Sequence, residues 1–116
     1  MRISWILSIL LAALLLIPVA ASAAAGSASV KISSPLPGAK IDAMEQIKLV
    51  YEVVPGPRGD HVHVYVDNKE VGILRQLAGS YTLETLNPGA RNICVKVVNK
   101  AHVPIGVEQC VKVNVE

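Results

Sequence analysis

Short segments in which every second residue is aliphatic or aromatic recur along most of this 116-residue chain. The clearest two carry their apolar residues at Ile47, Leu49, Tyr51 and Val53, and at Val62, Val64 and Val66. A period of two places alternate side chains on opposite faces of a strand, so each segment is expected to be a strand with one buried face. The pattern therefore predicts an all-β protein.

Seven such segments follow one another at short, fairly even intervals, separated by residues that favour turns. They span residues 30–41, 45–56, 61–67, 70–77, 79–86, 91–99 and 107–116. Pro35 and Pro37 interrupt the first segment, which is expected of an edge strand because such a strand can spare amide donors. About seven antiparallel strands of this kind predict a single β-sandwich or barrel.

Residues 1–23 have the layout of a secretory signal peptide. Arg2 precedes an apolar run that Pro18 ends, and an Ala-Ser-Ala cleavage motif closes at Ala23. We expect cleavage after Ala23, with Ala25 as the alternative position. The other interpretation is an uncleaved anchor, because the apolar stretch is long enough to span a bilayer.

Cleavage would leave residues 24–29 as a flexible leader and residues 30–116 as one folded domain. Of the 11 Lys and Arg residues only Arg2 would be lost, so ten basic residues would face nine acidic ones. Without a basic run the domain has no means of displacing counterions from phosphates, so nucleic acid is not an expected partner. We expect a periplasmic or secreted monomer that makes no membrane contact after signal cleavage.

The strings "YVDNKEVG", "GSYTLETLNPGARNICVKVVN" and "VKVNV" resemble parts of the immunoglobulin-like and fibronectin-like β-sandwich modules of secreted bacterial proteins. The resemblance covers residues 30–116 and implies an immunoglobulin-like sandwich, a fold that carries many functions. True immunoglobulin domains have a buried Trp and a disulfide between the two sheets. This chain departs from them, because its only Trp is Trp5 and its cysteines lie on neighbouring strands.

Cys94 and Cys110 are the only cysteines of the chain. In an exported protein a disulfide is the expected state of two cysteines. If the last two strands form a hairpin centred near His102, the cysteines face each other on the outer side of the sheet. We therefore predict a disulfide, which would contribute about 3 kcal/mol to the free energy of unfolding on the chain-entropy model.

His61 and His63 lie two residues apart in a predicted strand, on the face opposite its valines. Their Cα atoms should be about 6.6 Å apart, so both rings can reach one ion. The immunoglobulin resemblance implies that the loop before His61 and the loop that carries His102 lie at the same end of the sandwich. Asp60 would lie beside them.

Imidazole suits copper and zinc, and three such ligands suffice for a site with an open position. We therefore predict a copper or zinc site formed by His61, His63 and His102, with Asp60 as a fourth ligand or as the partner of a ligand. The alternative is that these are ordinary residues at exposed strand positions, which tolerate histidine.

Catalytic motifs are lacking: the sequence contains no G-x-S-x-G, no P-loop and no dinucleotide fingerprint. A domain this small, with so few aromatic residues, also has little room for a deep pocket. We expect an exported, non-catalytic binding module that takes a metal ion. The alternatives are a protein-interaction or cell-surface module that binds an unidentified protein partner without metal and, third, a small metalloenzyme centred on the histidines.

Overall fold

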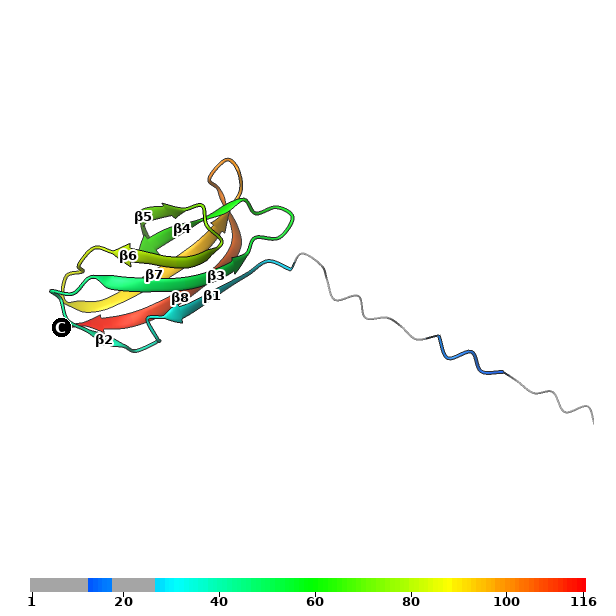
Figure 1. Ribbon diagram of the computed structural model, residues 1–116, viewed down its shortest axis with the longest axis horizontal. Coiled ribbons are helices and arrows are strands. Elements are labelled where there is room, and N and C mark those ends of the chain that lie inside the picture. Colours follow the sequence, from blue (N-terminus) through cyan, green and yellow to red (C-terminus); the bar gives the residue numbers. More distant parts are fainter. Residues whose placement is uncertain (1–12, 18–26) are drawn as a thin grey trace, which may run out of the picture.

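The computed structural model describes residues 13–17 and 27–116 (Figure 1). The predicted signal peptide, residues 1–23, and the start of the predicted leader lie mostly outside the described residues. Within the described part every regular element is a strand, so that part holds no helix able to cross a membrane. The prediction of an all-β domain is confirmed.

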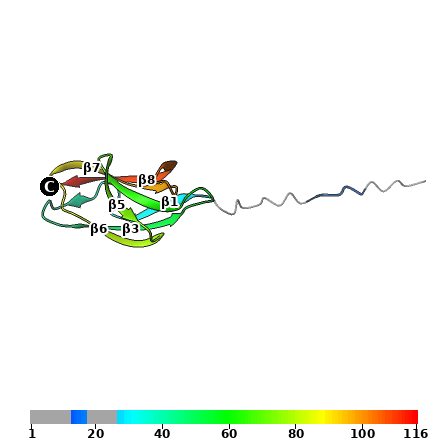
Figure 2. The same cartoon turned by 90° about the horizontal axis from the view of Figure 1, so that it is seen from above.

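Eight strands form two packed sheets from residue 29 onward. They are β1 (Ser29–Ser34), β2 (Lys40–Ile41), β3 (Ile47–Val54), β4 (His61–Val66), β5 (Lys69–Leu74), β6 (Ala78–Leu83), β7 (Gly89–Val98) and β8 (Pro104–Val115). One sheet has the order β1-β3-β6, and the other has the order β2-β8-β7-β4-β5. Seen from above, β3 and β6 lie in one layer and β7 and β8 in the other (Figure 2). The β-sandwich prediction is therefore confirmed.

The first predicted strand, residues 30–41, is divided between the two sheets. Its first part is β1, which pairs antiparallel with β3, and its end is β2, which pairs parallel with β8. Pro35 and Pro37 lie in the crossing between them, where the missing amide donors are not needed by either ladder. The described strands therefore number eight, one more than the segments in the sequence.

The core lies between the sheets and consists mainly of Val, Ile and Leu side chains. Its fully buried members are Leu49, Val62, Val64, Ile93, Val95, Val97 and Val113. Tyr51 is also buried, and its hydroxyl donates a hydrogen bond of 2.9 Å to the carbonyl oxygen of Gln76. The alternating apolar positions of β3 and β4 thus face inward, as their period of two predicts.

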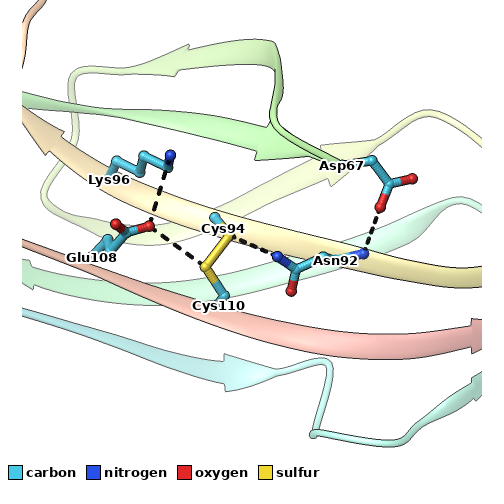
Figure 3. The surroundings of a disulfide bond; sticks show 6 residues. All are labelled: Asp67, Asn92, Cys94, Lys96, Glu108 and Cys110. Carbon is cyan, nitrogen blue, oxygen red and sulfur yellow. Dashed lines mark hydrogen bonds and ion pairs between the residues drawn. A yellow bond between two sulfur atoms is a disulfide. The ribbon is translucent and has the colours of Figure 1, made fainter.

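The last hairpin, β7–β8, has the predicted register over most of its length. Cys94 lies opposite Cys110, and a disulfide with a Cα–Cα distance of 4.0 Å joins them. The disulfide is on the outer face of the five-stranded sheet, beside Asn92 and Glu108 (Figure 3). The predicted disulfide is therefore confirmed.

Candidate metal centre

Ring nitrogens of the three histidines converge on one point at the start of β4. The Nε2 atoms of His61 and His63 are 3.0 Å apart. The Nδ1 atom of His102 lies 3.1 Å from the first and 3.0 Å from the second. The three nitrogens form a nearly equilateral triangle, so the structure brings together all three histidines singled out in the sequence.

His61 and His63 project from the outer face of β4, as predicted, but they are not exposed. Their exposed fractions are 1% and 2%. The alternative, ordinary residues at exposed strand positions, was wrong, because β4 has β5 on one side and β7 on the other, and the loop that carries His102 reaches back to β4. Buried polar rings need partners, so ordinary tolerance of histidine at an exposed position does not explain these two residues.

His102 lies in the loop 99–103, which joins β7 to β8 and is organised by one side chain. The Oδ1 atom of Asn99 accepts hydrogen bonds from the backbone N–H groups of Ala101 (2.9 Å) and Val103 (3.1 Å). His102 has a φ of 63°, in the left-handed region that few residues other than glycine adopt. A loop closed in this way presents the imidazole of His102 to β4. In Figure 1 this loop (orange) and the loop from β3 to β4 (green) lie at the end of the sandwich away from the C-terminus.

A bulge in β8 lies next to this loop. Lys96 is opposite Glu108, but the next pair is Val98 and Pro104, so three residues of β8 lie across from one of β7. Gly106, within the bulge, has a φ of 88°, a conformation that favours glycine. The simple hairpin register holds as far as Lys96 and fails beyond it. Bulges bend the strand that carries them, and here the hairpin tip beyond the bulge contacts β4.

The position of Asp60 is set by the backbone just before β4, which packs closely against β7. A Cβ atom on Gly59 would be only 2.6 Å from Cγ1 of Val97, so this position has no room for a side chain. The next residue, Asp60, donates its backbone N–H to the carbonyl oxygen of Val98 at 2.8 Å. The start of β4 is thereby held against the end of β7, and the Asp60 carboxylate lies beside the first histidine.

The carboxylate of Asp60 determines which nitrogen of His61 carries hydrogen. Its Oδ2 atom is 2.8 Å from Nδ1 of His61. An ionised carboxylate only accepts hydrogen bonds, so Nδ1 is the donor. In a neutral ring the Nε2 atom then carries a lone pair, and that lone pair is directed into the triangle. Asp60 therefore contacts the ring of His61, which fits the second of its two predicted roles, the partner of a ligand; that role stays a prediction.

His63 has a carboxylate near its outer nitrogen as well, at a longer distance. Among the described residues its buried Nδ1 atom has no hydrogen-bond partner, and Oε2 of Glu70 is 3.5 Å away. Burial lowers the pKa of His63, while the charge of Glu70 acts in the opposite direction. Desolvation thus favours the neutral ring, the form that binds metals. The sequence analysis did not identify Glu70 as part of this cluster.

Three ring nitrogens this close form a poor hydrogen-bond network but a good ligand set. An N–H group directed at the centre cannot donate a full hydrogen bond to both of the other nitrogens, and the remaining lone pairs repel each other. A cation satisfies all three. For a zinc-type ion about 2.0–2.1 Å from each nitrogen, the observed separations correspond to angles of about 95° at the ion. That geometry leaves one side of the ion open.

A second group of ligand-type atoms occurs at the disulfide. Atoms of Cys94, Glu108 and Cys110 lie within 4.8 Å of one another. Both sulfurs belong to the disulfide, so neither is a thiolate able to bind a metal. In this state the group is a structural link between β7 and β8.

Comparison with known proteins identifies the fold and nothing finer. No protein-family model matches the chain, and no curated protein matches it either. Among solved structures it is similar to the fibronectin(III)-like modules of Clostridium thermocellum CbhA, with a TM-score of 0.61 and 20% identity over 75% of this chain and 95% of that one. An engineered protein matches with a TM-score of 0.53 and 17% identity over 77% of this chain and 20% of that one.

A lytic polysaccharide monooxygenase from Jonesia denitrificans is a third match, with a TM-score of 0.47 and 18% identity over 71% of this chain and 60% of that one. At such identities only the fold is shared, and sandwiches of this type serve many purposes. The chain therefore has a fibronectin-like or immunoglobulin-like β-sandwich fold, as the sequence resemblance implies.

Proposed function

We propose that this protein is an exported, non-catalytic binding module that holds one divalent copper or zinc ion through His61, His63 and His102. The observation that carries the proposal is the triangle of ring nitrogens, each 3.0–3.1 Å from the other two. Export is suggested by the disulfide, because disulfides persist in oxidising compartments.

The donor set favours divalent ions over monovalent copper. All three donors are imidazoles, and the disulfide leaves no thiolate to attract a soft ion. For nitrogen ligands of this kind the affinity order of divalent metals places Cu(II) above Zn(II). Asp60 and Glu70 each bring a negative charge close to the rings, which offsets the two positive charges of such an ion.

Calorimetric titration with Cu(II) and with Zn(II) tests the proposal directly. We expect one ion per molecule, Cu(II) bound more tightly than Zn(II), and loss of binding in a His61→Ala/His63→Ala/His102→Ala variant. Lys100→Ala is the control, because it alters the same loop without removing a ligand. Equal, weak binding by the wild type and the triple variant would refute a metal function.

A protein-interaction module is the second candidate, supported by two exposed apolar residues beside the histidines. Val103 follows His102 and is 53% exposed, and Ile73, opposite His63 in the ladder, is 49% exposed. In that case Ile73→Asp and Val103→Asp would abolish capture of the partner, whereas metal chelation would leave capture unchanged. Dependence of capture on bound metal would instead support the metal centre.

A further inference from the structure

The geometry points to Glu70 as a positioning residue of this metal centre. Its carboxylate accepts a hydrogen bond from Nδ1–H of His63 when an ion occupies Nε2, and a β-bulge in β5 directs it there. This inference rests on the proposed function, because it concerns the same three-histidine site.

The bulge is visible in the register of β4 and β5. The ladder is regular as far as the pair Val64–Gly72, and the next pair is Tyr65–Glu70. Val71 therefore has no partner on β4. Two residues of β5 occupy the space of one, which is the definition of a bulge.

Without this bulge Glu70 would face the wrong way. A regular ladder would place it opposite Val66, whose side chain belongs to the core. The extra residue moves Glu70 opposite Tyr65, on the outer face that also carries His63. Bulges commonly re-aim a side chain beside a functional site, and here the re-aimed side chain is a carboxylate next to a buried imidazole.

Glu70 lies near His63 without forming a hydrogen bond to it, and metal binding would favour that hydrogen bond. The Oε2–Nδ1 distance is 3.5 Å, and Nδ1 is buried without a hydrogen-bond partner in the described chain. The Glu70 side chain is 46% exposed, so it has freedom to move. An ion on Nε2 would place positive charge on the ring and strengthen the N–H donor, which would draw the carboxylate in.

With an ion bound, two histidines of the site would each be paired with a carboxylate in the same way. Asp60 already bonds Nδ1 of His61 at 2.8 Å, and Glu70 would bond Nδ1 of His63 in the same manner. Each carboxylate would fix one ring in the tautomer that leaves Nε2 free for the metal. His102 differs, because it offers Nδ1 to the centre and lies in an exposed loop.

Glu70→Gln and Glu70→Ala test the inference, with Zn(II) as the titrant. We expect Glu70→Ala to weaken Zn(II) binding by about 10–100-fold, the range typical of partners of metal ligands. Glu70→Gln should have a smaller effect, because the amide oxygen still accepts a hydrogen bond. Glu108→Gln is the matched control: this exposed carboxylate on β8 pairs with Lys96, and its loss should leave the affinity unchanged.

A second measurement separates positioning from a general structural effect. In NMR spectra of the Zn(II)-loaded wild type, the Nδ1–H proton of His63 should be observable and shifted downfield. That signal should move or vanish in Glu70→Ala while the Nδ1–H signal of His61 stays in place. Unchanged affinity and an unchanged His63 signal in Glu70→Ala would overturn the inference, provided that the triple histidine variant has lost binding. If the wild type itself binds no Zn(II), the proposed function fails and the inference fails with it.

Discussion

The Nε2 atom of His63 lies 3.0 Å from the Nδ1 atom of His102, although the two residues are 39 positions apart in the chain. One comes from an inner strand of the five-stranded sheet and the other from the tip of the neighbouring hairpin. The site therefore depends on the register of β7 and β8 as much as on its ligands. Changes far from the histidines should affect metal binding only when they disturb that register.

Gly106→Ala should weaken metal binding although residue 106 contacts no ligand. The φ of 88° at Gly106 is unfavourable for alanine by about 1–2 kcal/mol, so the bulge that carries the His102 loop should relax. Gly38→Ala is the matched control, because Gly38 also has a positive φ of 79° and, like Gly106, nothing within 4 Å of an added Cβ. Both variants should lose similar stability in urea, and only Gly106→Ala should bind Zn(II) less tightly. Equal affinities for the two variants would contradict this role of the bulge.

The metal-free protein should lose stability in mild acid because His63 is buried. Burial lowers its pKa below the value of 6.5 that the unfolded chain retains, although Glu70 partly opposes the shift. Between the two values the unfolded state binds the additional proton, so stability is complete above pH 6.5 and falls as the pH falls through this window. Urea unfolding between pH 5 and pH 8 with a chelator present measures the slope. A His63→Gln variant should show a smaller slope, and an equal slope would contradict the prediction.

Replacing both cysteines should destabilise the fold and spare the metal site. Cys94→Ala/Cys110→Ala removes a cross-link worth about 3 kcal/mol on the chain-entropy model. The disulfide lies on the same face as the histidines, but β7 and β8 are paired on both sides of it, and these pairs should hold the register without it. Urea unfolding should show the loss, and calorimetry of the folded variant should give nearly wild-type affinity. A variant as stable as the wild type would show that the disulfide contributes little.

Asp67→Asn should cost stability at neutral pH and nothing in strong acid. The Asp67 carboxylate accepts hydrogen bonds from the backbone N–H of Asn92 (2.9 Å) and from Arg91 (3.0 Å), and these hold its pKa below 3.8. A lowered carboxyl pKa stabilises the fold above pH 3.8, and this contribution is lost as the pH falls through the folded-state pKa. The group is exposed, so we expect a difference of about 1 kcal/mol or less. Urea unfolding of the wild type and the variant at pH 7 and pH 2.5 measures this difference. An equal difference in the free energy of unfolding at both pH values would contradict a role for the charge of Asp67.

Much of the fold could be predicted from alternation alone. The period of two correctly predicted which faces of β3 and β4 point inward. Cys94 and Cys110 are equally far in sequence from the centre of the hairpin, which correctly placed them opposite each other. These predictions succeed because regular ladders follow from side-chain parity. Asp67 and Asn68 join β4 to β5, and both residues have positive φ values, as two-residue hairpin turns require.

The histidine cluster was predictable in its members but not in its environment. Parity placed His61 and His63 on the outer face, yet parity says nothing of what covers that face, so their burial was missed. Glu70 was missed because a bulge inverts parity for the residues beyond it. The one sign of the bulge in the sequence is Gly72, next to Val71, since a glycine inside a strand often marks a bulge. The role of Asn99 depends on the closed shape of its loop, which short-range patterns do not reveal.

The loop built on Asn99 has a consequence for how quickly an ion would be captured. Its hydrogen bonds already hold His102 within 3.1 Å of both partners, so no segment has to close over an arriving ion. Capture would then be limited by encounter and by the exchange of water from the ion, and differences in affinity between variants would arise in the rate of release. A module of this kind would take up metal quickly, because the three nitrogens are already in place.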